Sequence, residues 1–191
     1  MSTTYHVGFF VGSLSSTSIN RRLAMALVRL APPELALSEI PFKDLPLYSP
    51  DYEASYPPVA TALKKAIADA DAVLFVTPEY NRSIPGGLKN AIDWASRPYG
   101  KNSFARKPSA TIGTSPGAIG TAIAQQHLRS LLGFCNSPQM NSPEGYIQFK
   151  QGLITEDGHV TNESTETFLR KYMTEFHGFI ERVYMVLPRP R

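Results

Sequence analysis

Short apolar runs along this chain alternate with longer segments whose apolar residues share one helical face. A short continuous apolar run bounded by turn residues is typical of a buried strand, and apolar residues at helical spacing are typical of a helix packed on one side. We therefore expect strands at residues 7–11, 35–40, 72–77 and 109–114, and a weaker fifth strand between Phe134 and Met140. Helices are expected at residues 23–30, 59–70, 88–95, 119–132 and 163–185.

Strands that alternate with helices predict parallel βαβ units. The pattern therefore indicates an α/β fold with three layers, in which helices cover both faces of a five-stranded parallel sheet. Residues 41–58, rich in proline and tyrosine, are expected to form a long loop. We find no internal repeat and no linker, so we expect a single domain over residues 1–187 and a short basic tail at 188–191.

Composition narrows the class of protein without identifying its activity. The 191 residues are 42% hydrophobic, enough for a packed core, and the formal net charge is only +3, from 19 basic and 16 acidic residues. Arg189 and Arg191 contribute two of those charges from the tail, which leaves +1 for the rest. Because no basic stripe accompanies them, we expect no nucleic-acid partner.

Cys135 is the only cysteine, so an intrachain disulfide and a metal site with several cysteine ligands are excluded. The histidines show no metal-ligand spacing, and we expect no bound metal. No apolar stretch approaches the ~20 residues of a membrane span, and no signal-peptide pattern opens the chain. We expect a cytoplasmic protein with no membrane partner.

The loop from Gly12 to Asn20 joins the first strand to the first helix and carries five hydroxyl side chains. Exposed N–H groups and the helix dipole at such a helix start favour a phosphate, and hydroxyls donate to phosphate oxygens without adding positive charge. The loop matches neither a Walker sequence nor a G-x-G-x-x-G fingerprint. The alternative is that Ser18 or Asn20 only caps the helix. The two interpretations are compatible, and the sequence leaves both open.

A second loop, within residues 77–94, follows the third strand. Pro78 and Pro85 stiffen it, and Gly86-Gly87 allow close approach to the backbone, so a flat ring has room to lie against peptide N–H and C=O groups. The alternative is a purely structural Pro-Gly turn that starts the next helix, and such turns are common.

A third small and polar loop, residues 113–120, follows the fourth strand. The carboxyl ends of parallel strands meet at one edge of the sheet, and ligands of open α/β sheets bind in the crevice at that edge. Three such loops therefore predict one concave site more strongly than any single loop does.

Together these residues resemble the NAD(P)H-dependent FMN reductase family, a flavodoxin-like group that contains bacterial chromate and quinone reductases. The resemblance runs from Val7 to about Val183. The matching segments are Gly12-Ser13-Leu14 with Ser18 and Asn20, then Leu45-Pro46-Leu47-Tyr48, then Thr77 to Trp94, the third loop, and His127-Leu128-Arg129.

The resemblance implies a flavodoxin-like three-layer sandwich that binds FMN tightly and takes electrons from NAD(P)H. It implies quinones, azo compounds, nitroaromatics, chromate or free flavin as acceptors, and no catalytic side chain, because the flavin carries the chemistry. By position, the implied FMN-binding residues are Ser13, Ser15, Ser18, Ile19 and Asn20 in the first loop, Pro78, Glu79, Tyr80 and Asn81 in the second, and Ser115 and Gly117 in the third.

Individual residues refine these expectations. Ser15 stands where the family often has an arginine, so one charged phosphate contact is missing, and Arg21 and Arg22 are the candidates to compensate. Glu79 is expected to orient its turn or to cross a dimer interface. Tyr48 and its long loop are expected to cover the flavin or to contact a second subunit, with ordinary surface as the alternative.

The leading function is therefore a two-electron oxidoreductase that moves a hydride from NAD(P)H to FMN and then reduces a small-molecule acceptor. The family is usually a dimer or a dimer of dimers, so a homodimer or homotetramer is expected. One alternative is a flavodoxin-like electron carrier, although a net charge of +3 differs from the strongly acidic flavodoxins. Another is a flavin-binding sensor with little NAD(P)H turnover. The sequence does not choose between NADH and NADPH.

Overall fold

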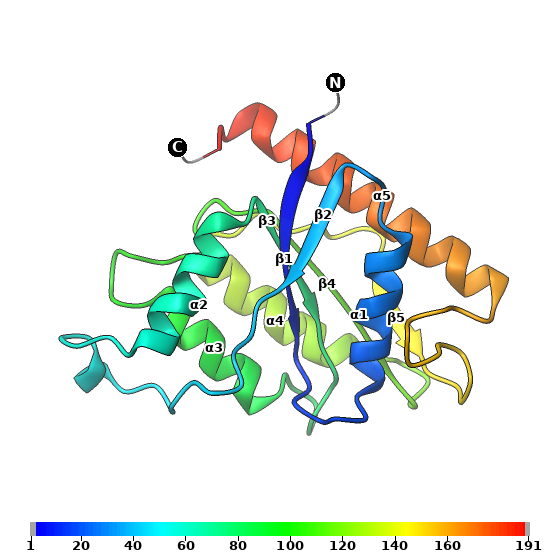
Figure 1. Cartoon of the computed structure of the whole chain (residues 1–191), viewed down its shortest axis with the longest axis horizontal. Coiled ribbons are helices and arrows are strands. Elements are labelled where there is room, and N and C mark those ends of the chain that lie inside the picture. Colours follow the sequence, from blue (N-terminus) through cyan, green and yellow to red (C-terminus); the bar gives the residue numbers. More distant parts are fainter. Residues whose placement is uncertain (1–2, 190–191) are drawn as a thin grey trace.

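Five parallel strands form the central sheet of the computed structural model, which describes residues 3–189 (Figure 1). The strands are β1 (Tyr5–Val11), β2 (Leu35–Glu39), β3 (Ala72–Val76), β4 (Ser109–Ser115) and β5 (Gly145–Gln148). They lie in the order β2-β1-β3-β4-β5, and each neighbouring pair is parallel. This is the flavodoxin-like strand order, and the expected α/β fold class is confirmed.

Helices cover both faces of the sheet (Figure 1). They are α1 (Ile19–Leu30), α2 (Pro58–Asp69), α3 (Gly86–Ser96), α4 (Ala122–Phe134) and α5 (Glu163–Val186), and a single 3-10 turn (Pro50–Tyr52) lies in the 41–58 loop. One hydrophobic core joins α1 and α5 to the sheet, and a second core joins α2, α3 and α4 to the opposite face.

The continuous apolar run of β1 follows from the burial of both faces. Val7, Phe9 and Val11 belong to the core beneath α1 and α5, whereas Phe10 belongs to the core beneath α2, α3 and α4. Side chains alternate along a strand, so a strand covered on both sides needs apolar residues at successive positions. All of β3 is buried in the same way.

The expected fifth strand between Phe134 and Met140 is wrong. Phe134 is the last residue of α4 and is 91% exposed, and Gln139 forms only an isolated bridge with Ser109. The apolar run in this region belongs to the end of the helix. The strand forms later, at β5, which pairs with β4 at the edge of the sheet. Of its four residues only Gly145 is buried, and Gln148 is exposed, so the strand carries little apolar signal.

The long helix α5 follows the sequence pattern closely. Asn162 caps its first turn by accepting the N–H of Thr165 at 2.9 Å. The buried hydroxyl of Tyr172 donates to the backbone oxygen of Thr111 at 2.7 Å, since a buried hydroxyl needs a partner.

Within residues 3–189, no helix combines the length and the apolar character needed to cross a membrane.

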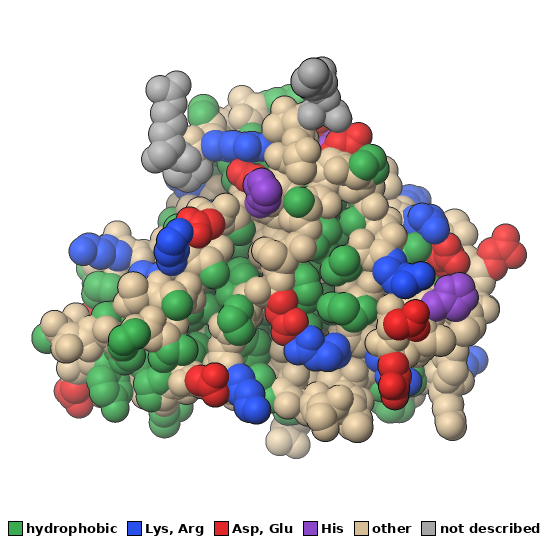
Figure 2. All heavy atoms as spheres, in the orientation of Figure 1, with side chains coloured by type: hydrophobic (Ala, Val, Ile, Leu, Met, Phe, Trp, Pro, Cys, Tyr) green, Lys and Arg blue, Asp and Glu red, His purple; other side chains and the backbone are tan. Residues whose placement is uncertain are grey.

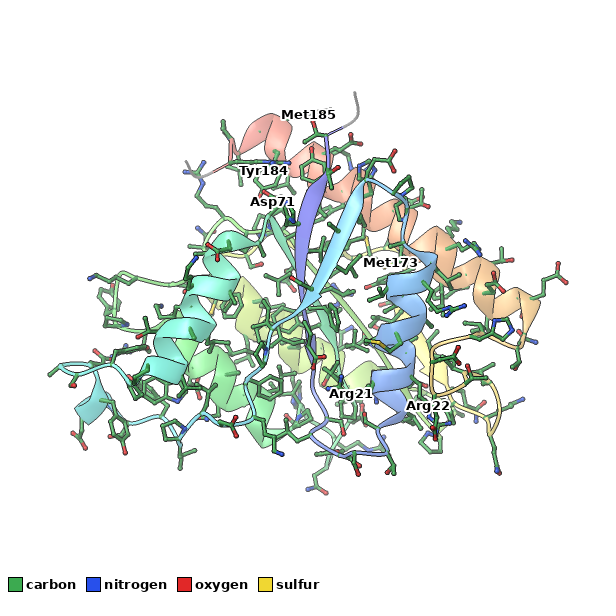
Figure 3. The ribbon with its side chains drawn as sticks, in the orientation of Figure 1. Arg21, Arg22, Asp71, Met173, Tyr184 and Met185 are labelled. Atoms are coloured by element: carbon green, nitrogen blue, oxygen red, sulfur yellow. The ribbon has the colours of Figure 1, made fainter. Side chains whose placement is uncertain are left out.

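The end of α5 returns to the amino-terminal ends of the strands, at the top of Figure 1. The hydroxyl of Tyr184 donates to the backbone oxygen of Asp71, and both residues are labelled in Figure 3. Arg189, which we expected in a short basic tail, pairs with Asp71 at 3.3 Å and lies over the ring of Tyr5 at 4.3 Å. The last two residues of that tail, Pro190 and Arg191, lie outside the described residues.

Gly113 is required where β4 passes the end of β3. A Cβ atom there would lie 2.0 Å from the backbone oxygen of Thr77 and 2.3 Å from the hydroxyl oxygen of Thr121. We expect Gly113→Ala to destabilise the protein by about 3 kcal/mol, because the backbone of β3 has no space to move away. The control is Gly86→Ala at the start of α3, where an added Cβ meets nothing within 4 Å and stability should be unchanged or slightly higher. Urea unfolding measures both, and equal midpoints would contradict the assignment.

Candidate functional site

A pocket of about 250 Å³ opens at the carboxyl ends of β1, β3 and β4, along the lower edge of the sheet in Figure 1. All three loops expected to converge contribute to its wall. Nine of the eleven residues named from the sequence line it: Ser13, Ser15, Ser18, Ile19, Asn20, Pro78, Glu79, Tyr80 and Ser115. Sequence reasoning missed Thr17, Thr114 and Pro116, for which the hydroxyl-rich first loop and the polar third loop were the available signals.

Asn81 and Gly117 are not part of this wall. Asn81 and Arg82 form the tip of a tight hairpin turn, with backbone φ angles of 51° and 63°, and the residues on either side close it with two backbone hydrogen bonds of 2.9 Å. Asparagine adopts this left-handed backbone more readily than most residues do. Asn81 therefore shapes the turn. Gly117 lies in the third loop, where its N–H donates to Ser115 Oγ at 3.2 Å.

The first loop leaves hydrogen-bond donors free at the start of α1. Ser18 caps the helix, because its Oγ accepts the N–H of Arg21 at 3.2 Å. The N–H groups of Ile19 and Asn20 have no acceptor among residues 3–189, and the first turn holds no acidic side chain. Unpaired donors at the positive end of a helix dipole bind anions. The turn is therefore capped by Ser18 and is also able to hold a phosphate.

Neutral donors surround this helix start. Among residues 3–189, Glu79 is the only charged residue in the wall of this pocket. Arg21 and Arg22, at the amino-terminal end of α1 (Figure 3), are both engaged elsewhere: Arg21 donates to Glu39 at 2.7 and 2.8 Å, and Arg22 pairs with Glu156 at 3.2 Å. The bonds to Glu39 raise the pKa of Arg21. Neither guanidinium therefore supplies a charged contact to a phosphate at the first loop in this arrangement.

Other charged side chains on the face that carries β2 and α1 also lie near charges of opposite sign. Figure 2 shows basic and acidic side chains interspersed over the face that carries β2 and α1, with several in direct contact. Arg21 and Glu39 form an ion pair at 2.7 Å, in which both side chains are more than a third exposed. Such exposed pairs contribute little stability individually.

Asn20 joins the first loop to the third. Its carboxamide oxygen accepts the N–H of Thr114 at 3.0 Å, and its carboxamide nitrogen donates to the backbone oxygen of Thr114 at 2.9 Å. Asn20 is only 1% exposed. The carboxamide therefore fixes the start of α1 against the end of β4, and the backbone N–H of Asn20 is the group left for a phosphate.

Ser13 joins the first loop to the second. Its Oγ lies 3.3 Å from the hydroxyl oxygen of Tyr80 and accepts the N–H of Ser15 at 3.3 Å. Ser13 is buried, while Tyr80 is 49% exposed. A half-exposed aromatic ring thus stands beside the buried hydroxyl groups of the pocket.

Glu79 makes its contacts within its own chain. Its carboxylate accepts the N–H groups of Ile123 and Ala124 at the start of α4, each at 3.0 Å, and pairs with Arg82 at 3.1 Å. The side chain is only 8% exposed. These contacts agree with the expectation that Glu79 orients its turn. Both carboxylate oxygens already have hydrogen-bond donors from the same chain.

The 41–58 loop is fastened to α3. Trp94 Nε1 and Asn90 Nδ2 both donate to the backbone oxygen of Pro46, at 2.7 and 2.9 Å. The ring of Tyr48 packs edge-on against Trp94, with 5.2 Å between ring centroids. Tyr48 does not line the pocket at the strand ends, so in this arrangement it anchors the loop.

The chain matches known proteins over nearly its whole length. A family model described as NADPH-dependent FMN reductase matches residues 5–152. The 2-hydroxy-1,4-benzoquinone reductase of Burkholderia sp. is 48% identical over 174 residues, which are 91% of this chain and 95% of that protein. A quinone reductase of Pseudomonas putida is 46% identical over 182 residues, 95% of this chain and 97% of that protein. Among solved structures, FerB, a flavoenzyme NAD(P)H:(acceptor) oxidoreductase from Paracoccus denitrificans, superposes with a TM-score of 0.90 at 45% identity, covering 94% of this chain and 98% of FerB.

The donor arrangement predicts that replacing Ser13 and Ser18 together by alanine weakens FMN binding roughly 10- to 100-fold, because hydrogen bonds to a charged phosphate contribute about 1.5–3 kcal/mol. Loss of the Ser18 cap also lowers stability by about 1 kcal/mol. Fluorescence titration with FMN measures the affinity.

The matched control is Asn162→Ala, which removes the cap of α5 with a similar expected loss of stability and touches no residue of the pocket. Its FMN affinity should equal that of the unmodified protein. An unchanged affinity in the double serine variant would argue against a phosphate at the first loop.

Proposed function

Because the chain belongs to the NADPH-dependent FMN reductase family, we propose that the pocket at its strand ends holds FMN and that quinones are its electron acceptors. Membership makes the protein an oxidoreductase that uses NAD(P)H and FMN and acts on small molecules. The assignment of the site and of the acceptor goes beyond membership and rests on the residues of the pocket.

The main support for the proposed FMN site is that three loops, far apart in sequence, converge on one pocket of about 250 Å³ at the carboxyl edge of the sheet. In an open α/β sheet, this edge is where ligands bind. Two of the loops are joined to the first loop by side-chain bonds, through Asn20 to Thr114 and through Ser13 to Tyr80. The wall is therefore fixed before any ligand enters, which favours binding.

The first loop suits the phosphate end of FMN. The unpaired N–H groups of Ile19 and Asn20 point from a helix start, and the hydroxyls of Ser13, Ser15 and Ser18 add further neutral donors. A dianionic phosphate needs several donors, and this segment offers them without a competing acidic side chain in the first helical turn.

The second and third loops suit the isoalloxazine ring. Pro78 and Tyr80 from one side and Ser115 from the other line the remaining wall, and they would hold the ring in place and keep water from part of its surface. When bound, FMN supplies the redox chemistry by taking a hydride from NAD(P)H and passing two electrons to the acceptor. The role of the side chains is then to bind and orient, so no acid or base is required of them.

Among the acceptors that the resemblance implies, we favour quinones because of the relatives that this chain matches. Two relatives that match over nearly the full chain are named as quinone reductases, at 48% and 46% identity. In the wall of the pocket, Tyr80 is 49% exposed, which gives a flat apolar molecule a surface to contact.

We expect the purified protein to be yellow, and excess NADPH to bleach it in the absence of oxygen. Addition of a benzoquinone should then restore the yellow colour in a two-electron step. Stopped-flow absorbance measures both steps, and chromate and an azo dye added in place of the quinone compare the acceptors.

A colourless protein whose colour FMN does not restore would overturn the proposed site. Full FMN occupancy with very slow oxidation of NADPH would instead favour an electron carrier or a sensor. Comparison of NADH with NADPH in the same instrument gives the preferred donor.

We also propose that the protein acts in the cytoplasm as a homo-oligomer. A cavity of about 430 Å³ lies between the turn after β3 and α4, with Ile84 and Leu131 in its wall, and Phe134 at the end of α4 is 91% exposed. An exposed apolar side chain beside an apolar cavity favours a partner surface, and the partner proposed is a second copy of this chain.

We expect light scattering after size exclusion to give a dimer or a tetramer at micromolar concentration. Phe134→Lys should shift the mass towards the monomer, because a charge there opposes burial. Met185→Lys, at a side chain 79% exposed on α5, is the control and should leave the mass unchanged. A monomer for the unmodified protein would refute the proposed assembly.

A further inference from the structure

The hairpin turn formed by residues 80–83 is fastened to α4 at two points. The carboxylate of Glu79, immediately before the turn, accepts the N–H groups of Ile123 and Ala124 at 3.0 Å each. At the other end of the turn, Ser83 Oγ lies 3.1 Å from His127 Nδ1. Residues three or four positions apart share one face of a helix, so the turn lies along a single face of α4.

Glu79 caps the amino-terminal end of α4, although it comes from a segment distant in sequence. Thr121 occupies the N-cap position of α4, but its hydroxyl accepts a hydrogen bond from Gln125 Nε2 at 2.9 Å. Glu79 therefore accepts the N–H groups that a local cap would otherwise accept, and its negative charge lies at the positive end of the helix dipole. With Arg82 at 3.1 Å, the buried carboxylate has three donors.

The turn needs this support because its backbone is not relaxed. Asn81 and Arg82 both have positive φ, at 51° and 63°. A non-glycine residue in this region persists only where the surroundings hold it there. Before the turn, the backbone oxygen of Thr77 lies so close to Gly113 that a Cβ atom there would be 2.0 Å away. The segment from β3 to the turn is therefore held by the backbone of β4 at one end and by α4 at the other.

We propose that Glu79 is a positioning residue for the flavin: by tying its turn to the start of α4, it fixes the wall of the pocket that faces the ring. This inference rests on the proposed FMN site. Glu79 and Tyr80 both line the pocket, so a shift of the turn moves the wall itself. Loss of the tie makes FMN order the turn as it binds, and that ordering weakens the observed affinity.

The same carboxylate also places a negative charge in the wall of the pocket, where it is the only charged side chain among the described residues. Reduction adds negative charge to a flavin, so a neighbouring carboxylate opposes reduction, and its removal favours it. A residue whose charge lies far from the flavin would have no effect on the potential of the bound flavin. The potential therefore tests whether the carboxylate lies beside the ring, and the FMN dissociation constant tests whether it positions the wall.

The test compares Glu79→Gln with Glu166→Gln. Glu166 lies in the first turn of α5 and pairs with Arg170 at 2.8 Å, so this control removes the same charge from a helix start and from an arginine pair, away from the pocket. Fluorescence titration measures the FMN dissociation constant, and reductive titration with a reference dye measures the midpoint potential of the bound flavin.

We expect Glu79→Gln to bind FMN roughly tenfold more weakly and to have a more positive midpoint potential. Glu166→Gln should match the unmodified protein in both readouts. If Glu79→Gln does not fold, His127→Ala tests the inference in its place. This variant removes the contact between Ser83 and α4 by changing an exposed side chain, and it should also weaken FMN binding.

Equal dissociation constants and potentials in Glu79→Gln and Glu166→Gln, with the unmodified protein binding FMN, would overturn this inference and leave the proposed function intact. An unchanged FMN affinity in the His127→Ala variant, used where Glu79→Gln does not fold, would likewise overturn this inference and leave the proposed function intact. Failure of the unmodified protein to bind FMN overturns the proposed function, and this inference with it.

Discussion

Burial of both faces of a parallel sheet is the constraint on which the rest of this structure depends. Apart from the exposed His6 near the start of β1, β1 and β3 carry apolar residues and glycine towards the two helical layers, so the polar side chains next to these two strands gather in the loops at their carboxyl ends. At that edge the loops leave the hydrogen-bonded ladder and need other partners. Polar side chains of one segment supply them to the backbone of another, as Asn20 does for Thr114 and Glu79 does for the start of α4.

This constraint explains how much of the molecule was readable from its sequence. Burial imposes periodicity, so β1 to β4 and all five long helices left clear patterns, whereas β5 did not, because it has four residues and only Tyr146 and Ile147 among them are apolar side chains. The site loops were recognisable because each follows a strand. The partners of Asn20 and Glu79 were not, even though the sequence indicated that Glu79 orients its turn, since these partners lie 94 and 44 residues away and no local pattern encodes such a distance. The place of Asn81 at a turn tip was not readable for a related reason: it depends on backbone angles that residue type alone does not fix.

The pocket also shows how a family site can be built with less charge. Position 15 is a serine, and Arg21 and Arg22 are held in pairs with Glu39 and Glu156. A phosphate held here would depend on the orientation of neutral donors and on the helix dipole. Hydrogen bonds between partly buried groups are screened less by salt than contacts between exposed ions, so such a site keeps its affinity across ionic strengths.

The pairing of Asn20 with Thr114 limits how this sequence can vary. The side-chain amide of Asn20 behaves like one extra peptide group added beside β4, giving and accepting one hydrogen bond with a single residue. Aspartate has the same shape but no donor, and it would set two acceptors against each other in a space that is 1% exposed. Leucine would leave both backbone groups of Thr114 unpaired. The neighbouring serines make separate contacts, Ser13 with Tyr80 and Ser18 with Arg21, but each of these contacts needs only a hydroxyl group. Position 20 needs a group that donates and accepts at once, so the carboxamide of Asn20 is the most constrained side chain of this loop.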